Sequence, residues 1–347
     1  MSRLIFFDST LRDGSHAIAH QLPIESIEKY CRIMDEAGMY TIIVGHGNGL
    51  GASSLQVGLA KHTDEEMVCT ARENLSNTKL GAYMIPGFGT ISDDLKPAIE
   101  RGIDLICVGT HCTEADVTRQ HIEYARSEGI EAYGVLMMFH MASTERLLEE
   151  ALKMQEYGAM GLILMDSAGA ATPELVKKTI STLVDNLNIR VGFHPHNNLG
   201  LAVGNGYIAI NEGATIIDAT TRGFGAGAGN CQMEALLALL DKSGVYTGVD
   251  LYKVLDASEA VIKDLVIGKQ GLSDISIVSG MSGVFSSFAT QVKKASERFD
   301  VDPRDIFIEL GKRKVVGGQE DLVVEIAIEL QKKKFDDNMT YQIESLL

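Results

Sequence analysis

The chain has 347 residues, 45% of them hydrophobic, so it is long enough to bury one large core or two smaller ones. Its formal net charge of −16 argues against a nucleic-acid or anionic-membrane partner, because binding phosphate groups requires a basic face. No apolar stretch reaches the roughly 18 residues of a membrane helix, the first apolar run is too short for a signal peptide, and the five cysteines are scattered. We therefore expect a globular cytoplasmic protein without a disulfide framework or a zinc ribbon.

Short apolar runs typical of strands recur along the first two thirds of the chain. Eight are found, at residues 4–7, 41–44, 79–85, 104–108, 131–138, 161–165, 190–193 and 216–219. The segments between them have helical periodicity, and three carry helix start signals: Thr63 with Glu66, Ser92, and Thr172 before Pro173. Eight such strand–helix units predict a (β/α)8 TIM barrel. We prefer it to an open doubly wound sheet because polar residues follow nearly every run.

The sequence changes character after about Gly244. No further strand-like run follows, and helical periodicity is found at residues 251–265, 283–296, 303–310 and 322–332. We expect two units, a catalytic barrel over residues 1–245 and a helical C-terminal domain over residues 246–347.

Enzymes with this barrel build their active sites from strand ends and the loops that follow. The first predicted strand ends in Asp8-Ser9-Thr10-Leu11-Arg12-Asp13-Gly14-Ser15-His16, and the seventh in His194-Pro195-His196. Histidines two residues apart on an extended chain project to the same side and can bind one ion. Asp13 would complete a set of two histidines and one carboxylate, which suits Mn²⁺ or Fe²⁺ and leaves positions open for substrate oxygens. The alternative is a pair of ordinary hydrogen-bonded histidines.

Two further side chains of the first motif have chemical potential. Arg12 would place a fixed cation where negative charge develops on a substrate oxygen, and its alternative is a structural salt bridge to Asp13 or Asp8. His16 is the best candidate for a free base, because imidazole titrates in the useful range, and its alternative is a surface or capping histidine.

A glycine-rich loop at residues 223–230 follows the eighth predicted strand. It lacks the lysine and Ser/Thr of a P-loop, and the context of a dinucleotide-binding motif is also missing. We expect flexible backbone near the site, with Asn230 in indirect contact with the metal. Ser167, after the sixth strand, is a candidate contact for a substrate carboxylate.

These motifs resemble the metal-dependent superfamily that includes isopropylmalate synthase and hydroxymethylglutaryl-CoA lyase. Within it, the chain resembles the 4-hydroxy-2-oxovalerate aldolase family. The resemblance runs from residue 8 to 230, and residues 283–288 are similar to the start of the family's helical C-terminal segment. The segments most similar to this family are Gly14-Ser15-His16-Ala17-Ile18, Val44-Gly45-His46-Gly47, Gly109-Thr110-His111-Cys112-Thr113-Glu114-Ala115-Asp116, Asp166-Ser167-Ala168-Gly169 and Gly225-Ala226-Gly227-Ala228-Gly229-Asn230.

The resemblance implies a class II aldolase, a carbon–carbon lyase that cleaves or forms a 4-hydroxy-2-oxo acid from pyruvate and an aldehyde. It implies the metal ligands Asp13, His194 and His196, with Mn²⁺ as the expected ion and Mg²⁺ or Co²⁺ as alternatives. It also implies that Arg12 stabilises charge on a pyruvate enolate and that His16, directly or through water, removes the 4-hydroxyl proton.

Substrate contacts are expected from four residues: Arg12, Ser167, His194 and Tyr83. The family's C-terminal segment typically carries two tyrosines, one of which reaches the active site, and here Met281 and Phe285 stand in their place. We expect these two residues to shape the pocket, with looser stereochemical control or a different substrate as the result. We also expect Tyr83 and Phe139, at strand ends where the family has an aliphatic residue and a serine, to reshape the same pocket.

Several alternatives stay open at this point. A Claisen-type synthase or acyl-CoA lyase is one, although acyl-CoA lyases place a cysteine inside the glycine-rich loop and here Cys231 follows Asn230. A degenerate scaffold subunit for an aldehyde dehydrogenase is another, and the complete ligand set argues against it. A lysine Schiff base is the mechanistic rival. However, no lysine lies at a predicted strand end except Lys79, which begins its strand instead of ending it. Family members usually pair with an acylating acetaldehyde dehydrogenase, so we expect a homo- or hetero-oligomer.

Overall fold

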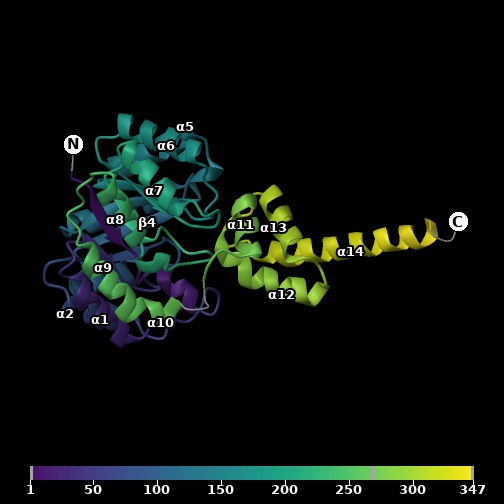
Figure 1. Cartoon of the computed structure of the whole chain (residues 1–347), viewed down its shortest axis with the longest axis horizontal. Coiled ribbons are helices and arrows are strands. Elements are labelled where there is room, and N and C mark those ends of the chain that lie inside the picture. The colour runs from purple at the N-terminus through teal and green to yellow at the C-terminus, as the bar shows by residue number, and fades with distance from the viewer. Residues whose placement is uncertain (1–2, 267–269, 345–347) are drawn as a thin grey trace.

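The computed structural model describes residues 3–266 and 270–344, and its larger part is a closed barrel of eight parallel strands (Figure 1). The predicted TIM barrel is therefore confirmed, and the open doubly wound sheet is excluded. Each strand is hydrogen-bonded to the next, and β8 closes onto β1. The strands are β1 Ile5–Asp8, β2 Thr41–Ile43, β3 Lys79–Met84, β4 Leu105–His111, β5 Glu131–Met137, β6 Gly161–Asp166, β7 Arg190–Pro195 and β8 Ile216–Ala219.

The strands are buried on both faces, which explains why they appear in the sequence as continuous apolar runs. One hydrophobic cluster fills the barrel interior, and a larger one lies between the strands and the surrounding helices. The register brings the strand ends level, since Met165 of β6 lies opposite His194 of β7 and Phe7 of β1 lies opposite Asp218 of β8. Polar residues at the ends of these strands therefore meet at one rim.

In the described part of the chain, each strand is followed by a helix that covers the outside of the barrel. These helices are α1 Ile24–Met34, α2 Asp64–Glu73, α3 Lys96–Glu100, α4 Arg119–Ser127, α5 Thr144–Glu156, α6 Pro173–Asn186, α7 Ala202–Asn211 and α8 Met233–Lys242. Two start signals are confirmed, because Thr63 and Glu66 form a capping box on α2 and Thr172 caps α6. The signal at Ser92 is wrong, since the side chain of Thr90 accepts the capping hydrogen bond there.

The chain continues after α8 with α9 Leu251–Ala257 and α10 Lys263–Val266, joined by a π-helical turn at Ser258–Ile262. Val254 and Ala257 of α9 belong to the same hydrophobic cluster as the barrel helices. These residues therefore pack on the barrel.

Within the described residues 270–344, four helices form a separate C-terminal lobe, which confirms the helical character predicted for the end of the chain (Figure 1). They are α11 Asp274–Ser282, α12 Ala289–Phe299, α13 Pro303–Lys312 and α14 Asp321–Glu344, and the last extends away from the body. The lobe has its own core, which includes Val284, Phe288 and Phe307. Within the described ranges, no helix has both the length and the apolar character needed to cross a bilayer.

The prediction of one helix over residues 283–296 is wrong. Gly283 instead ends α11 with a left-handed φ of 66°, and a short 3-10 turn at Ser286–Phe288 separates it from α12. A left-handed residue after a helix is a common terminator, and glycine takes this conformation without strain. The turn places Phe285 and its neighbours against the barrel.

Candidate active site

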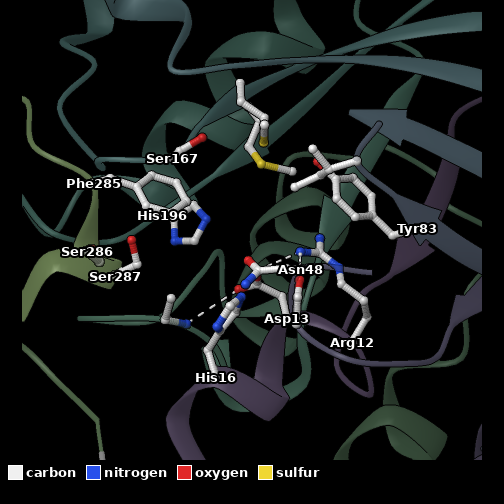
Figure 2. Close-up of a pocket in the computed structure, with 15 residues that line it drawn as sticks. Arg12, Asp13, His16, Asn48, Tyr83, Ser167, His196, Phe285, Ser286 and Ser287 are labelled. Atoms are coloured by element: carbon white, nitrogen blue, oxygen red, sulfur yellow. Dashed lines mark hydrogen bonds and ion pairs between the residues drawn. The ribbon is translucent and has the colours of Figure 1, made fainter. Parts of the chain in front are cut away.

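A pocket opens at the carboxyl ends of the strands, where the turn between α11 and α12 meets the barrel rim (Figure 2). Its lining combines charged and polar groups with apolar side chains. The lining residues are Arg12, Asp13, His16, Gly47, Asn48, Tyr83, Ile85, Met137, Met165, Ser167, His196, Ala226, Phe285, Ser286 and Ser287. His194 is close by but is not among them.

Asp13, His194 and His196 form a cluster of candidate metal ligands. Each offers one donor atom, and the three atoms lie within 4.8 Å of one another. All three residues are buried, and neither His194 Nε2 nor His196 Nδ1 has a hydrogen-bond partner in the described part of the chain. Two imidazoles and a carboxylate with unused donor atoms fit a divalent cation. The structure thus brings together the three residues selected from the sequence.

The Asp13 carboxylate is held by hydrogen bonds on both oxygens. Its Oδ1 accepts from Arg12 Nη1 at 2.7 Å, and its Oδ2 accepts from Asn230 Nδ2 at 2.6 Å and from the backbone amide of Ala226 at 3.4 Å. Burial by itself would raise the pKa of Asp13, but the Arg12 guanidinium and the nearby imidazoles outweigh it and hold that pKa well below its ordinary value. The carboxylate therefore stays charged although it is buried.

The two histidines differ in their surroundings. His194 Nδ1 lies 2.8 Å from Asp218 Oδ2 of β8, the kind of carboxylate contact that orients metal-binding imidazoles. Burial lowers the pKa of His196 to about 3, so this imidazole is neutral near pH 7 and has a lone pair available. Asp218 was not selected from the sequence, because no local motif marks it.

Arg12 is fixed in place rather than free at the surface. Besides its bond to Asp13, it donates from Nη1 to the carbonyl of Gly47 at 3.2 Å and from Nη2 to Ser9 Oγ at 3.3 Å. Its Cζ atom lies 4.5 Å from the centre of the Tyr83 ring, a cation–π arrangement. The salt bridge to Asp13 is present, and the guanidinium also lines the pocket.

His16 also lines the pocket and packs closely against Gly47, where a Cβ atom would lie 2.4 Å from His16 Nε2. Burial lowers the pKa of His16, and the negative charge of Asp13 opposes part of this effect. Because its pKa is low, the imidazole is neutral near pH 7 and is able to accept a proton.

Behind His16 lie two further imidazoles, those of His20 and His46. The ring centres of His16 and His20 are 4.9 Å apart, and His20 stacks on His46 at 3.6 Å. His46 is anchored by its Nε2 contact with the carbonyl oxygen of Gly58 at 3.1 Å. No sequence motif marks this cluster as a whole, although His16 and His20 stand four residues apart in the chain.

Ser167 and Asn230, two further candidates from the sequence, both lie at this site. Ser167 lines the pocket and accepts a hydrogen bond from the Met138 amide at 3.2 Å. The glycine-rich loop is more constrained than the expected flexible backbone, because Gln270 Oε1 accepts from the Gly225 amide at 2.9 Å and Gln270 Nε2 donates to the Gly223 carbonyl at 2.7 Å. This loop positions Asn230 beside Asp13.

The C-terminal lobe supplies one wall of the pocket. Phe285 lines it, whereas Met281 is 63% exposed on α11, so the expectation that both residues shape the pocket is wrong for Met281. The turn is held by Asn198, whose Nδ2 donates to Ser286 Oγ at 3.0 Å, and by His140, whose Nε2 lies 3.2 Å from the Gly283 carbonyl oxygen.

Lys79 is remote from this pocket. It begins β3 and pairs with Glu131 at the start of β5, at the opposite end of the barrel. No lysine is among the lining residues in the described ranges, so the geometry does not favour a Schiff base.

Comparison with known proteins supports the family resemblance that the sequence motifs indicate. Residues 3–261 match the HMGL-like family, and residues 270–332 match the DmpG-like communication domain. The 4-hydroxy-2-oxovalerate aldolase of Pectobacterium atrosepticum is 52% identical over 331 residues, which cover 95% of this chain and 96% of that protein. That of Spirochaeta aurantia is 49% identical over 334 residues, which cover 95% and 97%.

The chain belongs to the 4-hydroxy-2-oxovalerate aldolase family. Members with this name are carbon–carbon lyases, and their similarity extends over both the barrel and the lobe. A solved carboxyl transferase domain of Rhizobium etli pyruvate carboxylase shares the fold, with a TM-score of 0.80, 15% identity, and coverage of 96% of this chain and 62% of that one. The HMGL-like match also agrees with the cluster of candidate metal ligands.

Acidification is expected to destabilise this aldolase-family protein through His20 and His46. Burial lowers the pKa of His20 to about 3 and that of His46 to about 4, whereas both titrate near 6.5 in an unfolded chain. As the pH falls below 6.5 the unfolded state binds more protons, so each histidine reduces the free energy of unfolding by about 1.4 kcal/mol per pH unit until its folded pKa is reached. Urea unfolding at pH 7, 6 and 5 in the presence of a chelator measures the slope.

A His46→Gln variant is the control, because glutamine keeps a hydrogen-bonding side chain but does not titrate. Its stability should depend less steeply on pH than that of the parent chain. Equal slopes for the two proteins would contradict the prediction.

Proposed function

We propose that this chain is a divalent-metal-dependent aldolase that cleaves a 4-hydroxy-2-oxo acid to pyruvate and an aldehyde, and catalyses the reverse condensation. The observation that carries the proposal is the cluster of Asp13, His194 and His196 beside a pocket that Arg12 and His16 also line. Relatives about 50% identical over nearly the whole chain are named 4-hydroxy-2-oxovalerate aldolases. This similarity supports the aldolase over the Claisen-type synthase, the acyl-CoA lyase and the scaffold subunit.

The proposed metal ligands are Asp13, His194 and His196, and we favour Mn²⁺, with Mg²⁺ and Co²⁺ as alternatives. Their donor set of one carboxylate and two neutral imidazoles supports this choice over ions that prefer thiolates. When bound, the ion would act as a Lewis acid that polarises the 2-oxo group of the substrate. Asn230 and Asp218 are proposed to orient the ligands Asp13 and His194.

Arg12 and His16 are proposed to carry the remaining chemistry. His16 takes the proton of the 4-hydroxyl group, and the electron pair of that O–H bond forms the aldehyde carbonyl as the C3–C4 bond breaks. The electrons of the broken bond generate the pyruvate enolate, and the fixed guanidinium of Arg12 stabilises its oxygen. A proton then adds to C3 to give pyruvate. Ser167 is proposed to contact the substrate carboxylate.

The His16→Ala variant tests this assignment. With added Mn²⁺, the parent chain should release pyruvate from 4-hydroxy-2-oxovalerate, and the variant should do so with kcat reduced by about 10²- to 10⁴-fold, because general-base catalysis contributes about that factor. Pyruvate is measured with lactate dehydrogenase and NADH.

The matched control is His121→Ala, which removes an imidazole from α4 on the outside of the barrel. It should retain the parent kcat. Full activity in His16→Ala would overturn the role of His16, and a parent chain that releases no pyruvate would overturn the proposed function.

We propose that the lobe binds an acylating acetaldehyde dehydrogenase, which would take the aldehyde product, so that the working protein is a hetero-oligomer. Residues 270–332 match the DmpG-like communication domain. Ile277 and Met281 expose apolar side chains on α11, at 46% and 63% exposure, and such surface is typical of protein interfaces.

Sedimentation of the chain mixed with an acylating acetaldehyde dehydrogenase from the same organism tests this partner. The two proteins should sediment together at micromolar concentration, and Met281→Glu should weaken the complex at least about tenfold because it buries a charge in the interface. The Met281 side chain does not line the pocket, so pyruvate release should be unchanged in this variant. Independent sedimentation of the two parent proteins would contradict the proposal.

A further inference from the structure

Tyr83 lines the pocket, and its hydroxyl oxygen is buried from solvent without a protein partner among the described residues. The residue as a whole is 2% exposed. Buried hydroxyl groups are usually hydrogen-bonded, because an unsatisfied one has lost its water without compensation. A hydroxyl group in this position is therefore available to a ligand.

The ring of Tyr83 is fixed by its two neighbours. The Arg12 guanidinium lies on the ring at 4.5 Å, and the hydroxyl group passes over Gly109 of β4. A Cβ atom at Gly109 would lie 1.9 Å from the Tyr83 oxygen, so only glycine leaves room for this side chain. In Figure 2, Tyr83 lies beside Arg12 and across the pocket from Phe285. The hydroxyl position is thus set in advance, as a specificity-determining group requires.

The surroundings of Tyr83 make its hydroxyl group distinctive. Ile85, Met137 and Met165 line the same pocket, and none of them offers a strong hydrogen-bonding group. Burial raises the pKa of Tyr83, so the phenol is neutral near pH 7 and can donate a hydrogen bond. Among the described lining residues it is the only phenol, because the lobe contributes Phe285.

We infer that Tyr83 makes the site selective for aldehydes that carry a hydroxyl group next to the carbonyl, of which glycolaldehyde is the simplest. The inference rests on the proposed aldolase function. In that reaction Arg12 and Ser167 serve the 2-oxo acid portion and His16 serves the reacting oxygen. The polar group of the substrates that remains to bind the Tyr83 hydroxyl is therefore a substituent of the aldehyde. Condensation breaks a C3–H bond of pyruvate, joins C3 to the aldehyde carbon and places a proton on the new 4-hydroxyl oxygen. The product is a 4,5-dihydroxy-2-oxo acid, and no group leaves.

The test compares glycolaldehyde with propanal, in which a methyl group replaces the hydroxyl group, in condensation with pyruvate and Mn²⁺. The parent chain should prefer glycolaldehyde in kcat/KM by about 10- to 100-fold, after correction for the hydrated fraction of each aldehyde, because propanal leaves the phenol unpaired. Tyr83→Phe should reduce this ratio at least about tenfold and leave the KM for pyruvate unchanged.

Tyr133→Phe is the matched control, since this second tyrosine of the barrel interior donates to Glu131 Oε2 at 3.0 Å, near the other end of the barrel. Its aldehyde ratio should equal that of the parent. An unchanged ratio in Tyr83→Phe would overturn the inference. If Tyr83→Phe slowed condensation equally with both aldehydes, the inference would also be overturned, because the phenol would then act on the reacting oxygen. Failure of the parent chain to condense pyruvate with any aldehyde would overturn the proposed function and this inference with it.

Discussion

The site depends on keeping one carboxylate charged inside the protein. Transfer of an isolated carboxylate from water to the interior is costly, and Asp13 avoids most of that cost through hydrogen bonds from Arg12, Asn230 and the Ala226 amide. These donors come from the loops after β1 and β8, so the charge also ties the two loops together. A cation bound by Asp13, His194 and His196 would complete the neutralisation of the Asp13 charge that Arg12 begins.

The closed barrel explains how ligands from opposite ends of the sequence meet. β8 lies between β1 and β7, and its Asp218 pairs in register with Phe7 on one side and contacts His194 on the other. The lobe then completes the enclosure, because Phe285 forms a wall and Gln270 holds the glycine-rich loop that presents Asn230. A barrel without its lobe would therefore lack both a pocket wall and part of the support for Asp13.

The strands were predictable because burial on both faces leaves continuous apolar runs in the sequence. The cluster of candidate ligands was predictable because Asp13 and the His194–His196 pair follow such runs. Helix α11 was not predicted, since its serine-rich sequence has little apolar periodicity and Gly283 resembles a helix start as much as an end. Asp218 and Gln270 were missed for another reason. Their contacts join segments far apart in the chain, and no local pattern records such contacts.

The central claim is that Asp13, His194 and His196 hold one divalent cation. Its most direct test is an anomalous difference map from crystals grown with Mn²⁺ and measured near the manganese absorption edge. The account predicts one strong peak within about 2.0 to 2.3 Å of a carboxylate oxygen of Asp13 and an imidazole nitrogen of each histidine, the usual range for such bonds. A map with no peak among these side chains, or with its strongest peak at another site, would contradict the account.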